Sequence, residues 1–294
     1  MKHIRIISPS GVIDPSYIDA ACARLRAWGY KVSEGAHARD TWGRFAGRDE
    51  DRIADFNDAV KDKEVDMILC TRGGYGAQRI LYDLLPANKP IIGFSDVTAL
   101  HQYAGAFLQP TIHGLMCKHI ATLPEDSEPI QAFQKILAGE TMHYHWDDHP
   151  LNRHGYAEGR LVGGNLSVLY GLQATPWGLD MLKTFHRHKP ILLIEDIGER
   201  HYHIDRMMRN LLMSEVLEYI GGLIVGQFTD CEEDPSMPLS IYETIKEVAA
   251  AYDYPIIFNA PVGHVEHNMP LWINRHTSIH CGTNGVLVTN GLQV

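Results

Sequence analysis

The first half of the chain alternates short apolar runs with stretches of helical periodicity. Apolar runs at 4–7, 65–70 and 90–93 predict buried strands, because each run is short and ends at a turn signal. Apolar residues spaced three or four positions apart predict helices over 18–28, 49–62 and 96–107, and a further helix reaching from the glycine-rich segment to Leu85. Strands and helices that alternate with short connections are typical of an α/β fold with a parallel, doubly wound sheet.

The second half is richer in strands than in helices. Apolar runs predict strands at 160–162, 190–194, 223–228, 255–258, 277–281 and 286–289. The clearest helix covers about 203–217 and carries one apolar stripe, which we interpret as core: Ile204, Met207, Met208, Leu211 and Leu212. This pattern favours a compact mixed β domain.

The segment between the halves, 143–156, is rich in polar and aromatic side chains and is typical of a connection between domains. We therefore predict an α/β domain over 1–140, a linker over 141–157 and a β-rich domain over 158–294.

Composition and charge exclude several classes of protein. The 294 residues are 45% hydrophobic and 21% charged, which excludes collagen-like, coiled-coil and wholly disordered chains. Lys and Arg total 26 against 36 Asp and Glu, a formal net charge of −10. We expect neither nucleic acid nor membrane as a partner, because no basic excess is present to neutralise phosphates.

Cysteine usage and the N-terminal residues point to the cytoplasm. The five cysteines are widely spaced and form no CxxC motif, so we expect a reducing compartment rather than a disulfide framework. The residues at 1–9 do not have the pattern of a signal peptide, and no apolar stretch approaches the roughly 20 residues of a membrane span. We expect a cytoplasmic enzyme.

Ser95 follows the predicted strand at 90–93 and opens a helix, in the sequence Gly93-Phe94-Ser95-Asp96. One interpretation is an ordinary N-cap, which the frequency of serine caps favours when this segment is taken alone. The other is a nucleophile on a sharp strand-to-helix turn, although Val97 stands where GxSxG has its second glycine.

The segment Arg72-Gly73-Gly74-Tyr75-Gly76 follows another predicted strand. Its glycines would let the backbone approach an anionic ligand, but a tight turn into a helix explains them equally well. Neither a GxGxxG nor a GxxxxGK[ST] motif is present, so nucleotide binding is not supported.

The second half offers a base and a carboxylate at strand ends. Glu195 and Asp196 close the apolar run that begins at 190, and His264 follows the strand at 255–258. Singly, the carboxylates read as charges at a helix start and His264 as a loop histidine. A serine nucleophile, however, requires a base and a group that orients the base.

Histidine pairs raise the alternative of a metal-dependent hydrolase. None of the pairs has the HExxH form, and most such histidines are exposed loop residues. The candidate pairs are His143/His145, His186/His188, His201/His203 and His264/His267.

Five segments together resemble one family in order and spacing. They are TRGGYGAQRIL (71–81), GFSDVTAL (93–100), EGRLVGGNLSVLYGLQATPW (158–177), LLIEDIGE (192–199) and PVGHVEHNMPLWI (261–273). On these segments the chain resembles the LD-carboxypeptidases of serine peptidase family S66. The resemblance implies a flavodoxin-like parallel-sheet N-terminal domain with a β-rich C-terminal domain, and commonly a homodimer.

The resemblance also implies roles for individual residues. Ser95 maps to the nucleophile, Glu195 to the carboxylate of the triad and His264 to its base. We expect the oxyanion to be bound by the backbone N–H groups of Asp96 and Gly74. Arg72 is the candidate for the substrate carboxylate, since a guanidinium matches a carboxylate geometrically. We expect no metal and no organic cofactor.

The implied reaction is removal of the terminal D-Ala from cytoplasmic murein tetrapeptides in cell-wall recycling. Two alternatives remain on the same scaffold, namely a relative that hydrolyses a peptide–nucleotide antibiotic and a non-catalytic peptide-binding protein.

Overall fold

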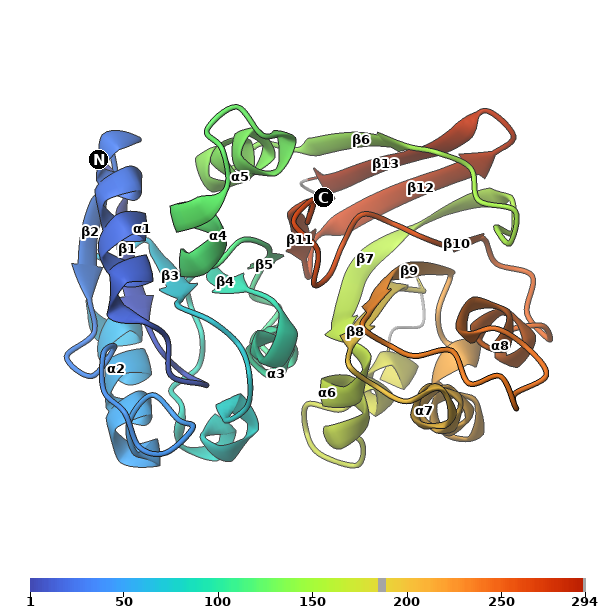
Figure 1. The fold of residues 1–294 in the computed structure, drawn as a ribbon, viewed down its shortest axis with the longest axis horizontal. Coiled ribbons are helices and arrows are strands. Elements are labelled where there is room, and N and C mark those ends of the chain that lie inside the picture. The colour runs from blue at the N-terminus through green and yellow to red at the C-terminus, as the bar shows by residue number, and fades with distance from the viewer. Residues whose placement is uncertain (185–188, 293–294) are drawn as a thin grey trace. The chain divides into compact units, whose positions relative to one another are not determined.

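The computed structural model describes residues 1–184 and 189–292. The chain divides into two compact units, Met1–Gln134 and Lys135–Val294, and each contains its own run of paired strands (Figure 1). Within the described ranges, no helix combines the length and the apolar content that a membrane crossing requires.

The first unit is built on a parallel sheet with the strand order β2-β1-β3-β4-β5. This is the flavodoxin-like order, in which ligands bind beyond the carboxyl ends of the strands. The strands are β1 (His3–Ile7), β2 (Lys31–Glu34), β3 (Met67–Cys70), β4 (Ile91–Gly93) and β5 (Thr111–His113). The doubly wound α/β domain predicted from the sequence is confirmed, whereas the short strands β2 and β5 were not predicted.

Helices α1 to α4 belong to this unit and α5 begins in it, and the ends of α1 follow local sequence signals. In α1, the Asp14 side chain caps the first turn by accepting from the Ser16 N–H at 2.9 Å, and Pro15 occupies the first helical position. The helix ends before Gly29, which has a φ of 90°. The bounds are α1 (Pro15–Ala27), α2 (Asp49–Lys61), α3 (Thr98–Gly105), α4 (Cys117–Thr122) and α5 (Glu128–Ala138).

The prediction of a helix from the glycine-rich segment to Leu85 is wrong. The segment forms two 3₁₀ helices, η1 (Ala77–Arg79) and η2 (Leu81–Asp83). The Asn57 side chain of α2 donates to the Asp83 carbonyl at 3.0 Å and accepts from the Leu85 N–H at 2.7 Å. These tertiary hydrogen bonds take the backbone groups that a continuing helix would pair, and such contacts are invisible in the local periodicity.

The second unit contains a mixed sheet with the order β10-β9-β8-β7-β12-β13-β6. Strands β10 to β7 pair in parallel, and β7, β12, β13 and β6 pair antiparallel. The strands are β6 (Met142–Trp146), β7 (Gly155–Asn165), β8 (Ile191–Ile197), β9 (Gly222–Thr229), β10 (Ile256–Ile257), β12 (His276–Gly282) and β13 (Gly285–Leu292). The mixed, strand-rich character expected for this half is confirmed.

The parallel strands of this sheet share a buried core with the helices α6 (Leu166–Gly171), α7 (His201–Met213) and α8 (Ile241–Val248). The stripe predicted on the 203–217 helix lies in this core, with Ile204, Met207, Met208 and Leu211 buried. The helix itself ends earlier than expected, at Met213, because Glu215 takes a left-handed φ of 63°. The 3₁₀ helices η4 (Leu179–Thr184) and η5 (Val216–Glu218) also belong to this unit.

The expected linker over 141–157 contributes strands to the sheet of the second unit. Met142, Tyr144 and Trp146 of β6 are buried while His143 and His145 are exposed, and β6 pairs with β13. This alternation is typical of a strand with one buried face. The prediction of a linker was based on the polar and aromatic composition of the segment and did not use the alternation.

The short strand β11 (Leu271–Ile273) is held by one buried side chain of β13. The Asn290 amide accepts from the Trp272 N–H at 2.6 Å and donates to the Trp272 carbonyl at 2.9 Å. It also donates to Thr277 Oγ1 at 2.8 Å. Asn290 therefore satisfies both backbone groups of Trp272, shortly after the segment that carries His264.

Replacing Asn290 with Ala should lower the free energy of unfolding by about 2–4 kcal/mol, because two buried backbone groups of Trp272 lose their partner. Asn284→Ala, on the exposed turn between β12 and β13, is the matched control and should change stability by less than about 0.5 kcal/mol. Urea unfolding of the two variants tests this, and equal losses would contradict the role of Asn290.

Candidate active site

Ser95 lies on a strained turn between β4 and the helix that follows. Its φ is 65°, in the left-handed region that costs a residue with a side chain about 1–2 kcal/mol. The 3₁₀ helix η3 (Ser95–Val97) begins here and continues into α3. Neither helix has a side-chain hydrogen bond at its N-cap, and their N-cap residues are Phe94 and Val97. The structure therefore does not support the N-cap interpretation of Ser95.

A buried histidine supports the strand end that precedes Ser95. His101 of α3 lies 2.9 Å from the Gly93 carbonyl through its Nε2 atom. Burial, with a smaller contribution from His113, lowers the pKa of His101 to about 3. The ring is thus neutral at physiological pH, and an Nε2–H tautomer donates to the Gly93 carbonyl.

The glycine-rich loop approaches Ser95 through Gly73. A Cβ atom at Gly73 would lie 2.7 Å from Ser95 Cβ, 2.9 Å from Ser95 Oγ and 3.0 Å from the Asp96 nitrogen. No side chain fits there, so this position requires glycine. At Gly74 the corresponding Cβ would instead meet Arg72 and Gly11, at 3.7 Å or more. Sequence reasoning selected Gly74 and missed Gly73, because spacing alone does not distinguish neighbouring glycines.

Asp96 connects three loops of the first unit. Its buried carboxylate accepts from Ser10 Oγ at 2.6 Å and from the Ala77 N–H at 2.9 Å, both through Oδ2. Asp96 therefore links its own turn to the loop after β1 and to the start of η1. Arg72 is exposed and donates through Nη1 to the Val12 carbonyl at 2.9 Å.

In the second unit, Glu195 and His264 form a hydrogen-bonded pair. Glu195 lies near the end of β8 and is fully buried, whereas 15% of the His264 side chain is exposed. Nδ1 of His264 lies 2.8 Å from Oε2 of Glu195. A carboxylate only accepts, so Nδ1 carries a proton, and in the neutral imidazole Nε2 carries the lone pair.

The backbone around this pair is fitted to the carboxylate. Gly263 has a φ of 133°, and a Cβ atom there would lie 3.0 Å from Glu195 Oε2. Its N–H donates to Asn268 Oδ1 at 3.0 Å, which fixes the turn that presents His264. Sequence reasoning did not single out Gly263.

The neighbouring carboxylate, Asp196, has a different environment. It accepts from Asn165 Nδ2 at 2.9 Å and from the Ser167 N–H at 2.8 Å in the first turn of α6. Burial, together with the charge of Glu195, raises the pKa of Asp196 to about 7. Of the two acidic residues singled out in the sequence, Asp196 binds the first turn of α6 from its place in β8, and Glu195 pairs with His264.

The histidine pairs of the metal-dependent alternative do not gather ligands where the structure describes them. His143 and His145 are exposed on β6. His201 is buried and approaches Thr244 and Glu233, and His203 pairs with Glu199 at 3.0 Å. His186 and His188 lie outside the described residues. Among the described residues, the groups of three metal-ligating side chains contain none of these histidines.

Two models of one family match the chain. The LD-carboxypeptidase N-terminal domain matches residues 4–114, and the LD-carboxypeptidase C-terminal domain matches residues 158–279. These are the two domains of serine peptidase family S66, and together they span the segments that carry Ser95, Glu195 and His264.

Whole-chain relatives agree with these matches. A probable murein peptide carboxypeptidase of Bacillus subtilis is 30% identical over 99% of this chain and 92% of its own length. The murein tetrapeptide carboxypeptidase of Pseudomonas aeruginosa is 28% identical over 90% of this chain and 89% of its own. The Microcin C7 self-immunity protein MccF of Escherichia coli is 26% identical over 90% of this chain and 86% of its own.

The fold agrees as well. The crystal structure of muramoyltetrapeptide carboxypeptidase from Oxalobacter formigenes superposes with a TM-score of 0.87 at 24% identity, covering 99% of both chains. The matched domains define a hydrolase of the serine peptidase class. Within that class, the chain belongs to the LD-carboxypeptidase family, S66.

Gly73→Ala should lower kcat about a hundredfold, because the added methyl group collides with Ser95 and a shift of about 1 Å at a reacting centre costs that much. The thermal unfolding midpoint should fall as well, because the methyl group can be placed only by shifting the turn at Ser95. Gly282→Ala is the matched control, since its Cβ would meet only His280 at 3.7 Å. Peptidase kinetics test this, and full activity of Gly73→Ala would show that the loop does not constrain Ser95.

Proposed function

We propose that the protein removes the terminal D-Ala from cytoplasmic murein tetrapeptides, with Ser95, His264 and Glu195 as its catalytic triad. The observation that carries this proposal is the 2.8 Å pair between His264 Nδ1 and the fully buried carboxylate of Glu195. The names of the B. subtilis and P. aeruginosa relatives, both murein peptide carboxypeptidases, support murein peptides as the substrate class.

The proposed chemistry follows from the tautomer of His264. With Nδ1 donating to Glu195, Nε2 takes the proton from Ser95 Oγ as this oxygen attacks the scissile carbonyl. Glu195 stabilises the imidazolium, which then protonates the leaving amine of D-Ala. A water molecule, deprotonated by the same Nε2 atom, hydrolyses the acyl-enzyme and restores Ser95.

Backbone donors complete the mechanism. The Asp96 N–H at the start of η3 and the Gly74 N–H are proposed to bind the oxyanion. The approach of Gly73 to Ser95 supports a role for this loop, since it holds the backbone of the loop next to the nucleophile. Arg72, held by the Val12 carbonyl, is proposed to bind the terminal carboxylate of the peptide. No step uses a metal or an organic cofactor.

The proposal includes a cytoplasmic location and a homodimer. All five cysteines are free thiols, which supports a reducing compartment. The homodimer is what the family resemblance implies, and light scattering of the purified chain measures it directly.

A second candidate substrate is a peptide–nucleotide conjugate. It is favoured by the similarity to the self-immunity protein MccF, at 26% identity. Competition between a murein tetrapeptide and a peptidyl nucleotide in one assay separates the two candidates, because the preferred substrate has the higher kcat/KM.

Ser95→Ala and His264→Ala should each lower kcat by about 10⁴-fold or more, and Glu195→Gln somewhat less, since it orients the base rather than transferring the proton itself. The exposed residues Ser236 and His280 provide matched controls as Ser236→Ala and His280→Ala. Ser95→Ala with near wild-type turnover would remove the nucleophile assignment. A wild-type protein that binds the tetrapeptide without releasing D-Ala would instead identify a binding protein.

The enzyme should cleave a tetrapeptide ending in an L-centre–D-Ala bond at least about a hundredfold faster than the same peptide ending in L-Ala. A fixed oxyanion site, a fixed carboxylate site and the approach of the nucleophile define three points, so inverting the terminal Cα displaces the reacting group. Chromatographic measurement of released alanine from the two peptides decides this. Equal rates would leave a serine peptidase but remove the cell-wall substrate.

A further inference from the structure

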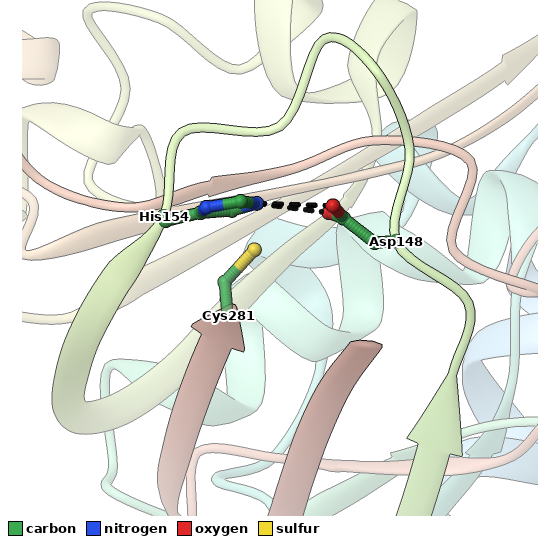
Figure 2. Close-up of side chains that lie close together, drawn as sticks. All are labelled: Asp148, His154 and Cys281. Atoms are coloured by element: carbon green, nitrogen blue, oxygen red, sulfur yellow. Dashed lines mark hydrogen bonds and ion pairs between the residues drawn. The ribbon is translucent and has the colours of Figure 1, made fainter. Parts of the chain in front are cut away.

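Three side chains with metal-binding atoms converge in the second unit, and the proposed peptidase mechanism uses none of them. They are Asp148, His154 and Cys281, and one ligand atom from each lies within 4.8 Å of the other two. Figure 2 shows the Cys281 sulfur pointing toward the edge of the imidazole that faces Asp148. Sequence reasoning did not find this group, since the three residues share no motif and 133 positions separate Asp148 from Cys281 (281 − 148).

Sheet pairing brings these residues together. Asp148 and His154 lie in the loop that joins β6 to β7, and Cys281 is near the end of β12. In the antiparallel ladder of β7 and β12, Cys281 is the register partner of Gly155, the residue after His154. The position of the thiol beside His154 is therefore a consequence of the register.

The loop that carries Asp148 and His154 is anchored to the body of the unit. The Arg153 N–H donates to the Ile256 carbonyl at 2.9 Å, and the Ile256 N–H donates back to the Arg153 carbonyl at 3.1 Å. The Arg153 guanidinium also donates to the carbonyls of Tyr252 and Ala249. The ligand atoms are thus held by ordered backbone rather than by a free loop.

Asn152 orients the carboxylate. Its Nδ2 atom donates to Asp148 Oδ1 at 2.8 Å, while its own Oδ1 accepts from the Phe258 N–H at 2.7 Å. The bond from Asn152, with a smaller contribution from His154, lowers the pKa of Asp148, so the carboxylate is ionised at neutral pH. Hydrogen bonds of this kind to ligating carboxylates are typical of metal sites.

The geometry does not fit a Cys–His–Asp nucleophile. In a triad, one imidazole nitrogen faces the acid and the other faces the nucleophile. Here Nε2 of His154 lies 3.1 Å from both Asp148 oxygens, and the sulfur approaches the same edge of the ring. Burial, together with the nearby charge of Asp148, raises the pKa of the Cys281 thiol to about 11, which is the opposite of an activated nucleophile.

We propose that Asp148, His154 and Cys281 form a binding site for a zinc-class divalent ion, with water as the fourth ligand. A thiolate, an imidazole and a carboxylate form a ligand set that suits Zn²⁺ and disfavours Mg²⁺ and Ca²⁺. Zinc bond lengths of about 2.0–2.3 Å at tetrahedral angles place ligand atoms roughly 3.3–3.7 Å apart. The 3.1 Å separation of His154 Nε2 from the Asp148 oxygens is already close to that spacing.

Binding involves proton release and no redox step. The Cys281 thiol gives its proton to solvent as the sulfur–zinc bond forms. The His154 proton that Nε2 shares with Asp148 moves to Nδ1 by exchange with solvent, so Nε2 and the carboxylate each bind the metal in place of their hydrogen bond. The thiolate and the carboxylate together neutralise the charge of the ion. Because the sulfur is buried while Asp148 and His154 are exposed, the ion enters from the solvent side. Once bound, it fastens the β6–β7 loop to β12.

Zinc titration of the purified chain against a chromophoric chelator tests the proposal. We expect one tight site per chain, an affinity about a hundredfold weaker in Cys281→Ser and in His154→Gln, and about 10–100-fold weaker in Asn152→Ala. The matched controls are Cys231→Ser and His280→Gln, in the same unit but outside the cluster, and they should bind as the wild type does. Equal affinity in wild type, Cys281→Ser and His154→Gln would identify adventitious binding to other histidines and overturn the proposal.

Cobalt(II) provides a direct view of the sulfur. The wild-type protein loaded with Co²⁺ should show a thiolate-to-metal charge-transfer band that is absent in Cys281→Ser and present in Cys231→Ser. Zinc should raise the thermal unfolding midpoint of the wild type and leave that of His154→Gln unchanged. His154→Gln keeps the test valid if Cys281→Ser fails to fold, because His154 is exposed. Absence of the thiolate band from the Co²⁺-loaded wild type would contradict ligation by Cys281.

Peptidase activity separates this proposal from the preceding one. D-Ala release should survive chelation of zinc and should be unchanged in His154→Gln. If chelation abolished activity and zinc restored it only where His154 is present, the site would be real but the cofactor-free mechanism would be wrong. If zinc does not bind while Ser95→Ala is inactive, the triad stands and the metal site does not.

Discussion

The geometry of the candidate site in the second unit depends on the hydrogen bond between His264 and Glu195. A fully buried carboxylate is costly unless its oxygens are satisfied, and the imidazole supplies a donor at 2.8 Å. The strands β7, β8 and β9 provide the buried environment, and glycine at 263 leaves room for the carboxylate beside the turn. The turn, the strand end and the choice of glycine all follow from keeping this one pair intact.

The first unit also contains a buried carboxylate that requires hydrogen-bond donors, that of Asp96. Its carboxylate lies under a turn whose first residue, Ser95, has a left-handed φ, and it receives donors from two other loops. Such strain persists only where the surroundings determine the backbone, and Asp96, His101 and the close approach of Gly73 are the contacts that do so.

The sequence predicted the elements whose signal is local. The apolar runs of β1, β3, β4, β8 and β9 and the stripes of α1 and α7 are strong periodic patterns, and the structure contains them all. Strands of three or four residues, such as β5 and β2, carry too few positions for a period to emerge. The prediction of a helix over 77–85 is wrong for another reason. Hydrogen bonds between Asn57 and the backbone of this segment override its helical spacing.

The candidate site was predictable in its residue types but not in its geometry. Ser95, Glu195 and His264 each have an ordinary interpretation when taken alone. The resemblance of five segments to one family is what assigned them to a single catalytic triad. The positive φ of Ser95 leaves no mark in the sequence, because the residue is not glycine. The different roles of Glu195 and Asp196 depend on which face of β8 each side chain takes, and β8 has a register irregularity between Ile194 and Asp196.

The attachment of three loops to the single carboxylate of Asp96 limits how this protein can be re-engineered. The loop after β1 and the start of η1 share one acceptor oxygen, so neither can be lengthened or exchanged by itself without releasing a donor into a buried space. To transfer the substrate preference of a relative, the loop after β1, the turn at Asp96 and the start of η1 must be exchanged together. The exchanged loop must include the residue that corresponds to Ser10. Directed evolution of this rim should accordingly yield paired changes far apart in the chain rather than single substitutions.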